Sequence, residues 1–98
     1  MIEALVERVE TEISEADRLF YLWKKKMAGK SRGWRVVGTH SANRIVFLCL
    51  ERRRRGQTIP KLIPQAAIVS VNPNDLRIRE FISKARSLAY RQLYAKVP

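Results

Sequence analysis

A run of six apolar residues, Ile45–Leu50, places the strongest constraint on how this chain folds. Side chains alternate between the two faces of a β-strand, so a strand built from this run is apolar on both faces. Both faces then need cover, either from helices on the two sides or from a helix on one side and a partner on the other. The run therefore predicts a central strand, which we expect to span residues 44–51.

The residues before this run predict its first neighbour in the sheet. Residues 34–40 are rich in residue types that favour strands, and the polar segment Ser41-Ala42-Asn43 separates them from the central strand. Two such runs joined by a short polar turn are typical of a β-hairpin.

Two prolines govern the interpretation of the next segment. Pro60 and Pro64 each lack a backbone N–H donor, so we interpret residues 57–65 as an extended loop or an irregular edge. A third strand is expected to follow over residues 66–71.

Helical periodicity is found at both ends of the chain. An apolar stripe at spacings of three and four predicts an amphipathic helix over residues 2–28, with Gly29 as its C-terminal cap. A second amphipathic pattern predicts a helix over residues 75–95, with Asn74 or Asp75 as its N-cap.

The expected order of elements is α-β-β-β-α. The chain has 98 residues, of which 46% are hydrophobic, and this is enough for one small core. We therefore expect a single α+β domain over residues 1–98, in which a small antiparallel sheet packs against a long N-terminal helix and a C-terminal helix.

This order is similar to that of double-stranded-RNA-binding domains, whose second helix and one strand-connecting loop meet the RNA backbone. The similarity covers most of residues 15–95. Those domains open their second helix with lysines, whereas this chain has Asn74-Asp75-Leu76-Arg77-Ile78-Arg79 there, so the resemblance is one of topology.

Charge is the second strong feature. The chain has 20 Lys and Arg residues against 9 Asp and Glu residues, a net charge of +11. Residues 1–17 hold six acids and one base, so residues 18–98 carry +16. An excess of this size attracts nucleic acid, anionic lipid or acidic protein, and it disfavours a neutral structural subunit. We interpret the acidic residues 1–17 as complementing the positive end of a helix dipole. The alternative is that they shield the basic surface.

Thirteen of the 20 bases are arginines, and the four of Arg52–Arg55 follow the central strand directly. A guanidinium is a planar fork that binds phosphate at two points and stacks on bases. We expect these four to contact a polyanion; the alternative is a solvated group that protects a strand edge from aggregation. A second basic surface is expected on the C-terminal helix. The expected phosphate contacts are Arg52, Arg53, Arg54, Arg55, Lys24, Lys25, Lys26, Lys30, Arg32, Arg77, Arg79, Lys84, Arg86 and Arg91.

Residues suited to catalysis or metal binding are few. With His40 and Cys49 as the only histidine and cysteine, no metal site, cofactor or nucleophile motif is expected. We interpret His40 as a turn residue, with a general base or a phosphate contact as the alternative, and Cys49 as a small buried hydrophobe. The single cysteine and the acidic start predict a reduced, cytoplasmic protein without a signal peptide. No apolar run approaches the ~20 residues of a membrane span.

These features favour a non-enzymatic nucleic-acid-binding protein that contacts the phosphate backbone of RNA or DNA with little or no sequence preference. The alternative is an assembly subunit that binds an acidic protein, or a second copy of itself through the N-terminal helix or the central strand. A third hypothesis is a ribonuclease-like enzyme, because small bacterial endoribonuclease toxins are similar in size and charge. That enzyme would depend on Arg55, Tyr90 and Arg91.

Overall fold

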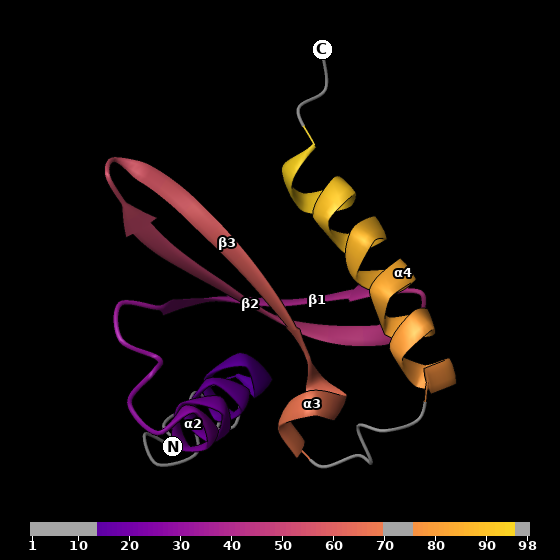
Figure 1. The fold of residues 1–98 in the computed structure, drawn as a ribbon, viewed down its shortest axis with the longest axis horizontal. Helices are drawn as coiled ribbons and strands as arrows, with labels where there is room; N and C mark the ends of the chain where they lie inside the picture. The colour runs from indigo at the N-terminus through magenta and orange to yellow at the C-terminus, as the bar shows by residue number, and fades with distance from the viewer. Residues whose placement is uncertain (1–13, 70–75, 96–98) are drawn as a thin grey trace, which may run out of the picture.

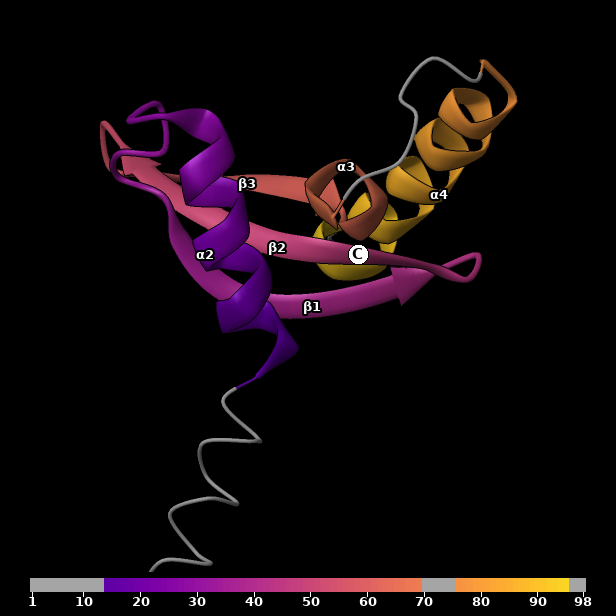
Figure 2. The same cartoon turned by 90° about the horizontal axis from the view of Figure 1, so that it is seen from below.

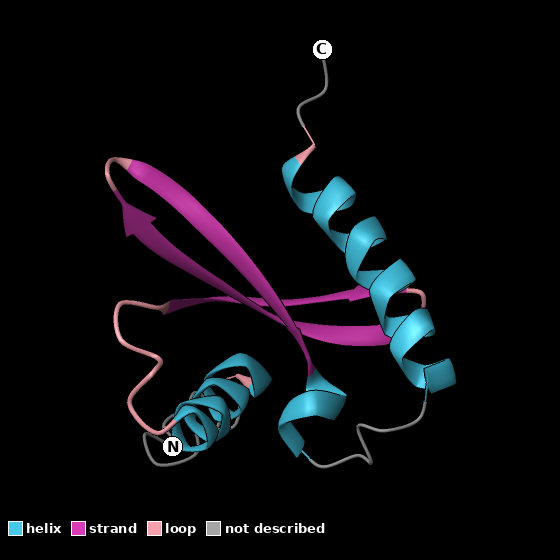
Figure 3. Ribbon diagram, in the orientation of Figure 1, coloured by secondary structure: helices cyan, strands magenta, loops and turns pink. Residues whose placement is uncertain are grey.

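The structure is a computed structural model that describes residues 14–69 and 76–95. Within these ranges, three strands form one antiparallel sheet in the order β1-β2-β3, with helices before and after it (Figure 1, Figure 3). This is the expected α+β class, with the short helix α3 added between the sheet and the last helix. The elements are α2 (Glu15–Met27), β1 (Arg35–Ala42), β2 (Ile45–Arg54), β3 (Gln57–Pro64), α3 (Gln65–Val69) and α4 (Leu76–Tyr94).

β2 is the central strand, as its sequence predicts. Phe47, Leu48 and Leu50 have no exposed surface. Helices α2 and α3 cover one face of the sheet and α4 covers the other (Figure 2). Helices of the same chain therefore cover the apolar side chains of this strand, and association of a second copy through it stays a prediction.

The two covers are built from different residue types. On one face, Leu48 and Leu50 pack against Leu19 and Trp23 of α2. These large side chains fill the space between helix and sheet.

None of the helices described reaches the length and apolar character that crossing a membrane requires.

On the opposite face, Phe47 and Cys49 of β2 pack against Ala85 and Ala89 of α4. The two alanines have no exposed surface, and their small side chains let the helix backbone approach the strand closely. Cys49 is buried here, as expected of a small hydrophobe, and burial raises the pKa of its thiol.

β1 and β2 form the expected hairpin, with a tighter turn than the sequence suggests. Asn43 and Arg44 make a two-residue turn with φ of 49° and 66°. Left-handed backbone at both positions is typical of the primed turns whose twist matches that of the strands. Ser41 and Ala42 therefore belong to β1 and not to the turn.

The third strand lies earlier than the sequence predicts. β3 begins at Gln57 and includes Pro60 and Pro64. Of the two interpretations of residues 57–65, the loop is wrong and the edge is confirmed, but this edge is regular, because residues 57–64 pair with β2 without a break. β3 is an edge strand, and an edge strand tolerates proline because its outward positions need no N–H donor.

The expected strand over residues 66–71 is also wrong. Residues 66–69 belong to α3, which follows β3 without a loop. Ile68 of this short helix packs on the same cluster as α2, so the segment covers the sheet and does not extend it. Residues 70 and 71 lie outside the described residues.

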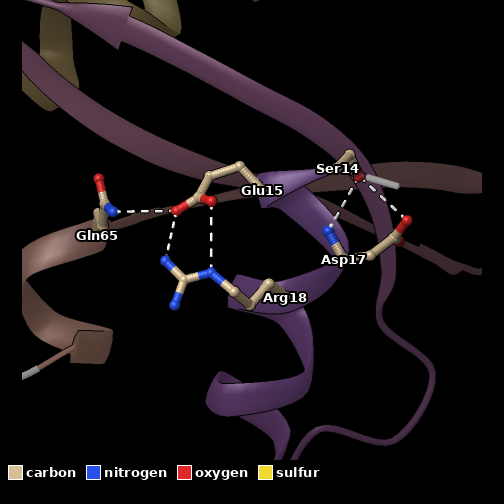
Figure 4. Close-up of polar contacts among 5 residues, drawn as sticks. All are labelled: Ser14, Glu15, Asp17, Arg18 and Gln65. Atoms are coloured by element: carbon tan, nitrogen blue, oxygen red, sulfur yellow. Dashed lines mark hydrogen bonds and ion pairs between the residues drawn. The ribbon is translucent and has the colours of Figure 1, made fainter. Parts of the chain in front are cut away.

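Ser14 marks the start of α2. The backbone N–H of Asp17 donates to Ser14 Oγ at 3.2 Å, and Ser14 Oγ donates to Asp17 Oδ2 at 3.1 Å (Figure 4). A serine whose hydroxyl accepts from a backbone N–H of the first helical turn is a typical N-cap. Because the backbone of Ser14 is not helical, the expected continuous helix over residues 2–28 is wrong at this position. Residues 2–13 lie outside the described residues.

The remaining helix limits can be compared directly. α2 ends at Met27, and Ala28 and Gly29 follow with φ of 48° and 92°. Left-handed backbone at this point ends a helix by satisfying its last carbonyls. α4 begins at Leu76, and its expected N-cap, residue 74 or 75, lies outside the described residues.

Leu19 is the position that tests the packing of α2. It is fully buried, whereas Tyr21 of the same helix is 58% exposed. Leu19→Ala is expected to lower the free energy of unfolding by about 2–5 kcal/mol, because it removes buried methyl groups and leaves a cavity. Tyr21→Ala should lower it by less than about 1 kcal/mol. Urea titration measures both, and equal losses would contradict this placement of α2.

Cys49 tests the cover provided by α4. The thiolate is the reactive form, and Cys49 is 4% exposed with a raised pKa. We expect a coloured disulfide reagent at pH 8 to label the folded protein far more slowly than the protein in strong urea. Equally fast labelling of the two would show that α4 does not shield this face.

Candidate nucleic-acid interface

β2 and β3 continue beyond β1 as a two-stranded ribbon. β1 pairs with β2 only as far as Glu51, whereas β3 continues the pairing as far as Arg54. Arg55 and Gly56 close the ribbon in a left-handed turn with φ of 52° and 78°. Figure 1 shows this turn pointing away from α4. We call residues 52–59 the ribbon.

The four arginines Arg52–Arg55, which the sequence predicts to contact a polyanion, lie in this ribbon. Arg53, Arg54 and Arg55 are exposed, and Arg52 is partly buried. Because side chains alternate along a strand, Arg52 and Arg54 share the face covered by α2, whereas Arg53 belongs to the opposite face. The run therefore presents positive charge on both faces of the ribbon.

Two further basic segments reach the same end of the molecule. Figure 1 shows the connection over residues 28–34 and the C-terminal end of α2 on the same side of the molecule as the β2–β3 turn, away from α4, with the turn itself set apart from them. A Cβ atom placed on Gly33 would lie 3.4 Å from Arg52 Cδ, so this connection touches the ribbon. The exposed bases of the two segments are Lys24, Lys25, Lys26, Lys30 and Arg32.

These segments contain no acid. Neither residues 24–34 nor residues 52–61 include an Asp or Glu. The acid next to the ribbon, Glu51, accepts a hydrogen bond from Arg35 at 3.1 Å. We call the group of bases at this end, which no described ion pair neutralises, the basic end. Its members are Lys24, Lys25, Lys30, Arg32, Arg52, Arg53, Arg54, Arg55 and Lys61.

The acids of α2 lie at the other end of that helix. Glu15 accepts a hydrogen bond from Arg18 at 2.6 Å and another from the side chain of Gln65 at 3.3 Å (Figure 4). The bond from Arg18 lowers the pKa of Glu15, and the same contact raises the pKa of Arg18. The carboxylate of Glu15 is thus paired locally.

Lys26 does not join the basic end. Its ammonium donates a hydrogen bond to the backbone oxygen of Ala67 at 2.6 Å, which satisfies a carbonyl near the end of α3. The neighbouring Lys24 and Lys25 differ, because their ammonium groups lie 4.9 and 4.7 Å over aromatic rings one turn earlier and make no hydrogen bond within the described residues. Lys26 therefore ties two helices together.

Two tryptophans and two cations meet beneath the basic end. Arg52 Cζ lies 4.8 Å from the centre of the Trp34 ring, and Lys61 Nζ lies 5.2 Å from the same centre. Lys61 Nζ also lies 5.7 Å from the Trp23 ring. The sequence prediction omits Lys61, because it places that residue in a loop. In the register of β2 and β3, Lys61 lies opposite Leu50, which fixes its face.

The bases of α4 lie on the other side of the sheet. Lys84 and Arg91 are exposed, and Arg86 is partly buried with an Nε that has no hydrogen-bond partner. Arg79 is engaged with neighbouring groups, and the side chain of Arg77 lies outside the described part. The structure therefore does not bring the expected second basic surface together with the basic end.

His40 and Tyr90 make contacts that hold α4 on the sheet. His40 Nε2 lies 2.8 Å from Gln92 Oε1, and because an amide oxygen accepts, the ring N–H donates. The backbone N–H of Leu62 donates to the Tyr90 hydroxyl at 3.1 Å. These bonds join α4 to β1 and to β3, so both side chains have structural roles.

The groups expected of a ribonuclease do not converge. Tyr90 contacts Leu62, six residues along β3 from Gly56, a separation of about 20 Å in an extended strand. Arg55 precedes Gly56 in the turn, so Arg55 and Tyr90 lie at opposite ends of β3. Within residues 14–69 and 76–95, no three His, Cys, Asp or Glu side chains come together as metal ligands would.

A shallow apolar hollow lies between α4, α3 and the start of β2, at the other end of the sheet. Phe81, on its wall, is 54% exposed. An exposed aromatic side chain in an apolar surface is a feature of interaction sites. The hollow is lined by Ile45, Ala66, Ile78, Phe81 and Ile82.

Comparison with known proteins adds no assignment to this geometry. No family model matches the chain, and no curated protein or solved structure matches it with significance. The similarity in element order to double-stranded-RNA-binding domains thus rests on topology alone. The candidate interface stands on the placement of its own residues.

Proposed function

We propose that the protein binds nucleic acid through its phosphate backbone, using the basic end. The observation that carries this proposal is that two stretches rich in cations and without an acid, residues 24–34 and 52–61, meet where Gly33 lies against Arg52 and where Lys61 lies over Trp23 and Trp34. Such a group raises the local concentration of polyanions and neutralises several phosphates at once.

The composition of the basic end supports backbone contact more than base reading. Five of its nine members are arginines, whose forked donors fit phosphate oxygens. Within residues 24–34 and 52–61, Gln57 at the tip of the ribbon is the only Asn or Gln, the residue types that read adenine. Contacts to phosphate fix position on the strand without reading sequence, so weak sequence preference follows.

The bases of α4 stand outside this contact. Because the sheet separates them from the basic end, a single strand or duplex lying across the ribbon does not meet both groups of bases at once.

A cytoplasmic location is part of the proposal, since the chain's one cysteine is buried and forms no disulfide within it.

The assembly hypothesis keeps one observation in its favour, the apolar hollow around Phe81. It lies at the end of the sheet opposite the ribbon, so the two functions use different surfaces. Phe81→Glu separates them. If the parent protein binds no oligonucleotide and this substitution halves its mass in light scattering, assembly replaces nucleic-acid binding as the function.

The parent protein is expected to bind random oligonucleotides with strong salt dependence. If about six phosphates are neutralised on duplex DNA, the log–log slope of affinity against salt is near −5. Fluorescence anisotropy with labelled duplex DNA, duplex RNA and single strands measures the slope and ranks the three forms. Binding that is absent or insensitive to salt for all three contradicts the proposal.

Arg55 and Arg44 form a matched pair for testing the position of the interface. Both are exposed turn residues with left-handed backbone, and they lie beyond opposite ends of β2. Arg55→Gln is expected to weaken binding several-fold and to make the duplex-DNA salt slope shallower by about 0.9, because one phosphate contact is lost. Arg44→Gln removes the same charge and should change affinity less than about twofold.

The comparison of these two variants decides between a local site and a general charge effect. Equal losses for Arg44→Gln and Arg55→Gln would mean that net charge alone drives binding. A larger loss for Arg44→Gln would place the interface at the opposite end of the sheet.

A further inference from the structure

We propose that Arg52 and Lys61 form a site for one phosphate group of the bound strand, and that Trp34 supports these two cations instead of stacking on a base. This inference rests on the proposed function and assigns a role to two residues of the basic end and to the ring between them.

The backbone places the two cations side by side. Arg52 lies opposite Ile59 in the β2–β3 register, and Lys61 is two residues further along β3. Residues related in this way share a face of the sheet and are diagonal neighbours. The face is the one that Leu50 shares with α2, so Trp23 and Trp34 lie beneath the pair.

The distances bring both charges to one ring. Arg52 Cζ is 4.8 Å and Lys61 Nζ is 5.2 Å from the centre of the Trp34 ring. Because both distances end at the same centre, the two charged groups lie no more than 10.0 Å apart. The negative face of an indole ring attracts cations, so Trp34 offsets part of their mutual repulsion.

The pair has unused capacity for an anion. Arg52 Nε is buried and has no hydrogen-bond partner, and no hydrogen bond or ion pair engages the ammonium of Lys61 in the described part of the chain. A buried donor without a partner is unfavourable, as are two like charges held together. A phosphate group relieves the repulsion, since it accepts from the guanidinium of Arg52 and the ammonium of Lys61 at once.

The tryptophans are poorly placed for base stacking. Trp23 is 4% exposed, and Trp34 packs against the core cluster of α2 while it carries two cations. A base needs an open aromatic face, as in proteins that bind single strands by stacking. The structure instead favours a phosphate above the ring, held by the side chains of Arg52 and Lys61.

The test compares Lys61→Gln, Trp34→Leu and the control Arg44→Gln on two probes of equal length, a labelled oligothymidylate and the same strand without bases. We expect Lys61→Gln to weaken binding to both probes about five- to tenfold, through one lost phosphate contact with slope loss near 0.7. Arg44→Gln should change affinity less than about twofold. Trp34→Leu keeps every charge, yet it should weaken binding to both probes by a similar factor.

Each outcome bears on a different statement. If the parent binds neither probe and no duplex DNA or duplex RNA, the proposed function fails; if it binds duplex alone, the same variants are compared on duplex DNA. If the parent binds but Lys61→Gln behaves as Arg44→Gln does, the phosphate site fails alone. A Trp34→Leu loss confined to the probe with bases would show stacking and overturn the role given to Trp34. Thermal unfolding of each variant shows whether it is folded. Should Trp34→Leu not fold, the result for Lys61→Gln alone decides whether the phosphate site exists.

Discussion

Burial of β2 on both faces is the constraint on which the rest of the structure depends. Leu48 and Leu50 need cover on one side and Phe47 on the other, so the helices cannot share a face. α2 and α3 supply one cover, and α4 supplies the other. This division also separates the bases at the end of α2 from those along α4. A chain with a net charge of +11 therefore has two basic regions with different surroundings.

The same strand carries both the core and the candidate interface. Its apolar residues end at Leu50, and from Arg52 onward β2 pairs with β3 alone. The arginines thus extend beyond the packed layers, where they do not disturb the core. Only Arg52 turns back, and it lies over Trp34. The ribbon combines a rigid base within the sheet with a solvated tip, which is a favourable arrangement for holding charges in fixed positions.

Sequence patterns predict the parts of the fold whose residues have one clear environment. The continuous apolar run predicts the central strand, and the polar turn predicts the hairpin. Pro60 argues against a strand in the sequence, but β3 has a free outer edge where a missing donor costs nothing. A prediction that misses β3 also misses Lys61, because the face on which Lys61 lies follows from the register of β3 with β2. The faces of the bases are not predictable by counting: Lys26 is adjacent to Lys25 but binds a backbone oxygen of α3.

The most direct test of the account is a map of the amide and indole signals of the folded protein during titration with an oligonucleotide. Amide NMR spectra with labelled nitrogen report each residue separately. We expect that the signals that move belong to residues 24–34 and 52–61, including the Trp34 indole, and that they return when salt is added. Movement centred on α4, or spread evenly over both faces of the sheet, would contradict it.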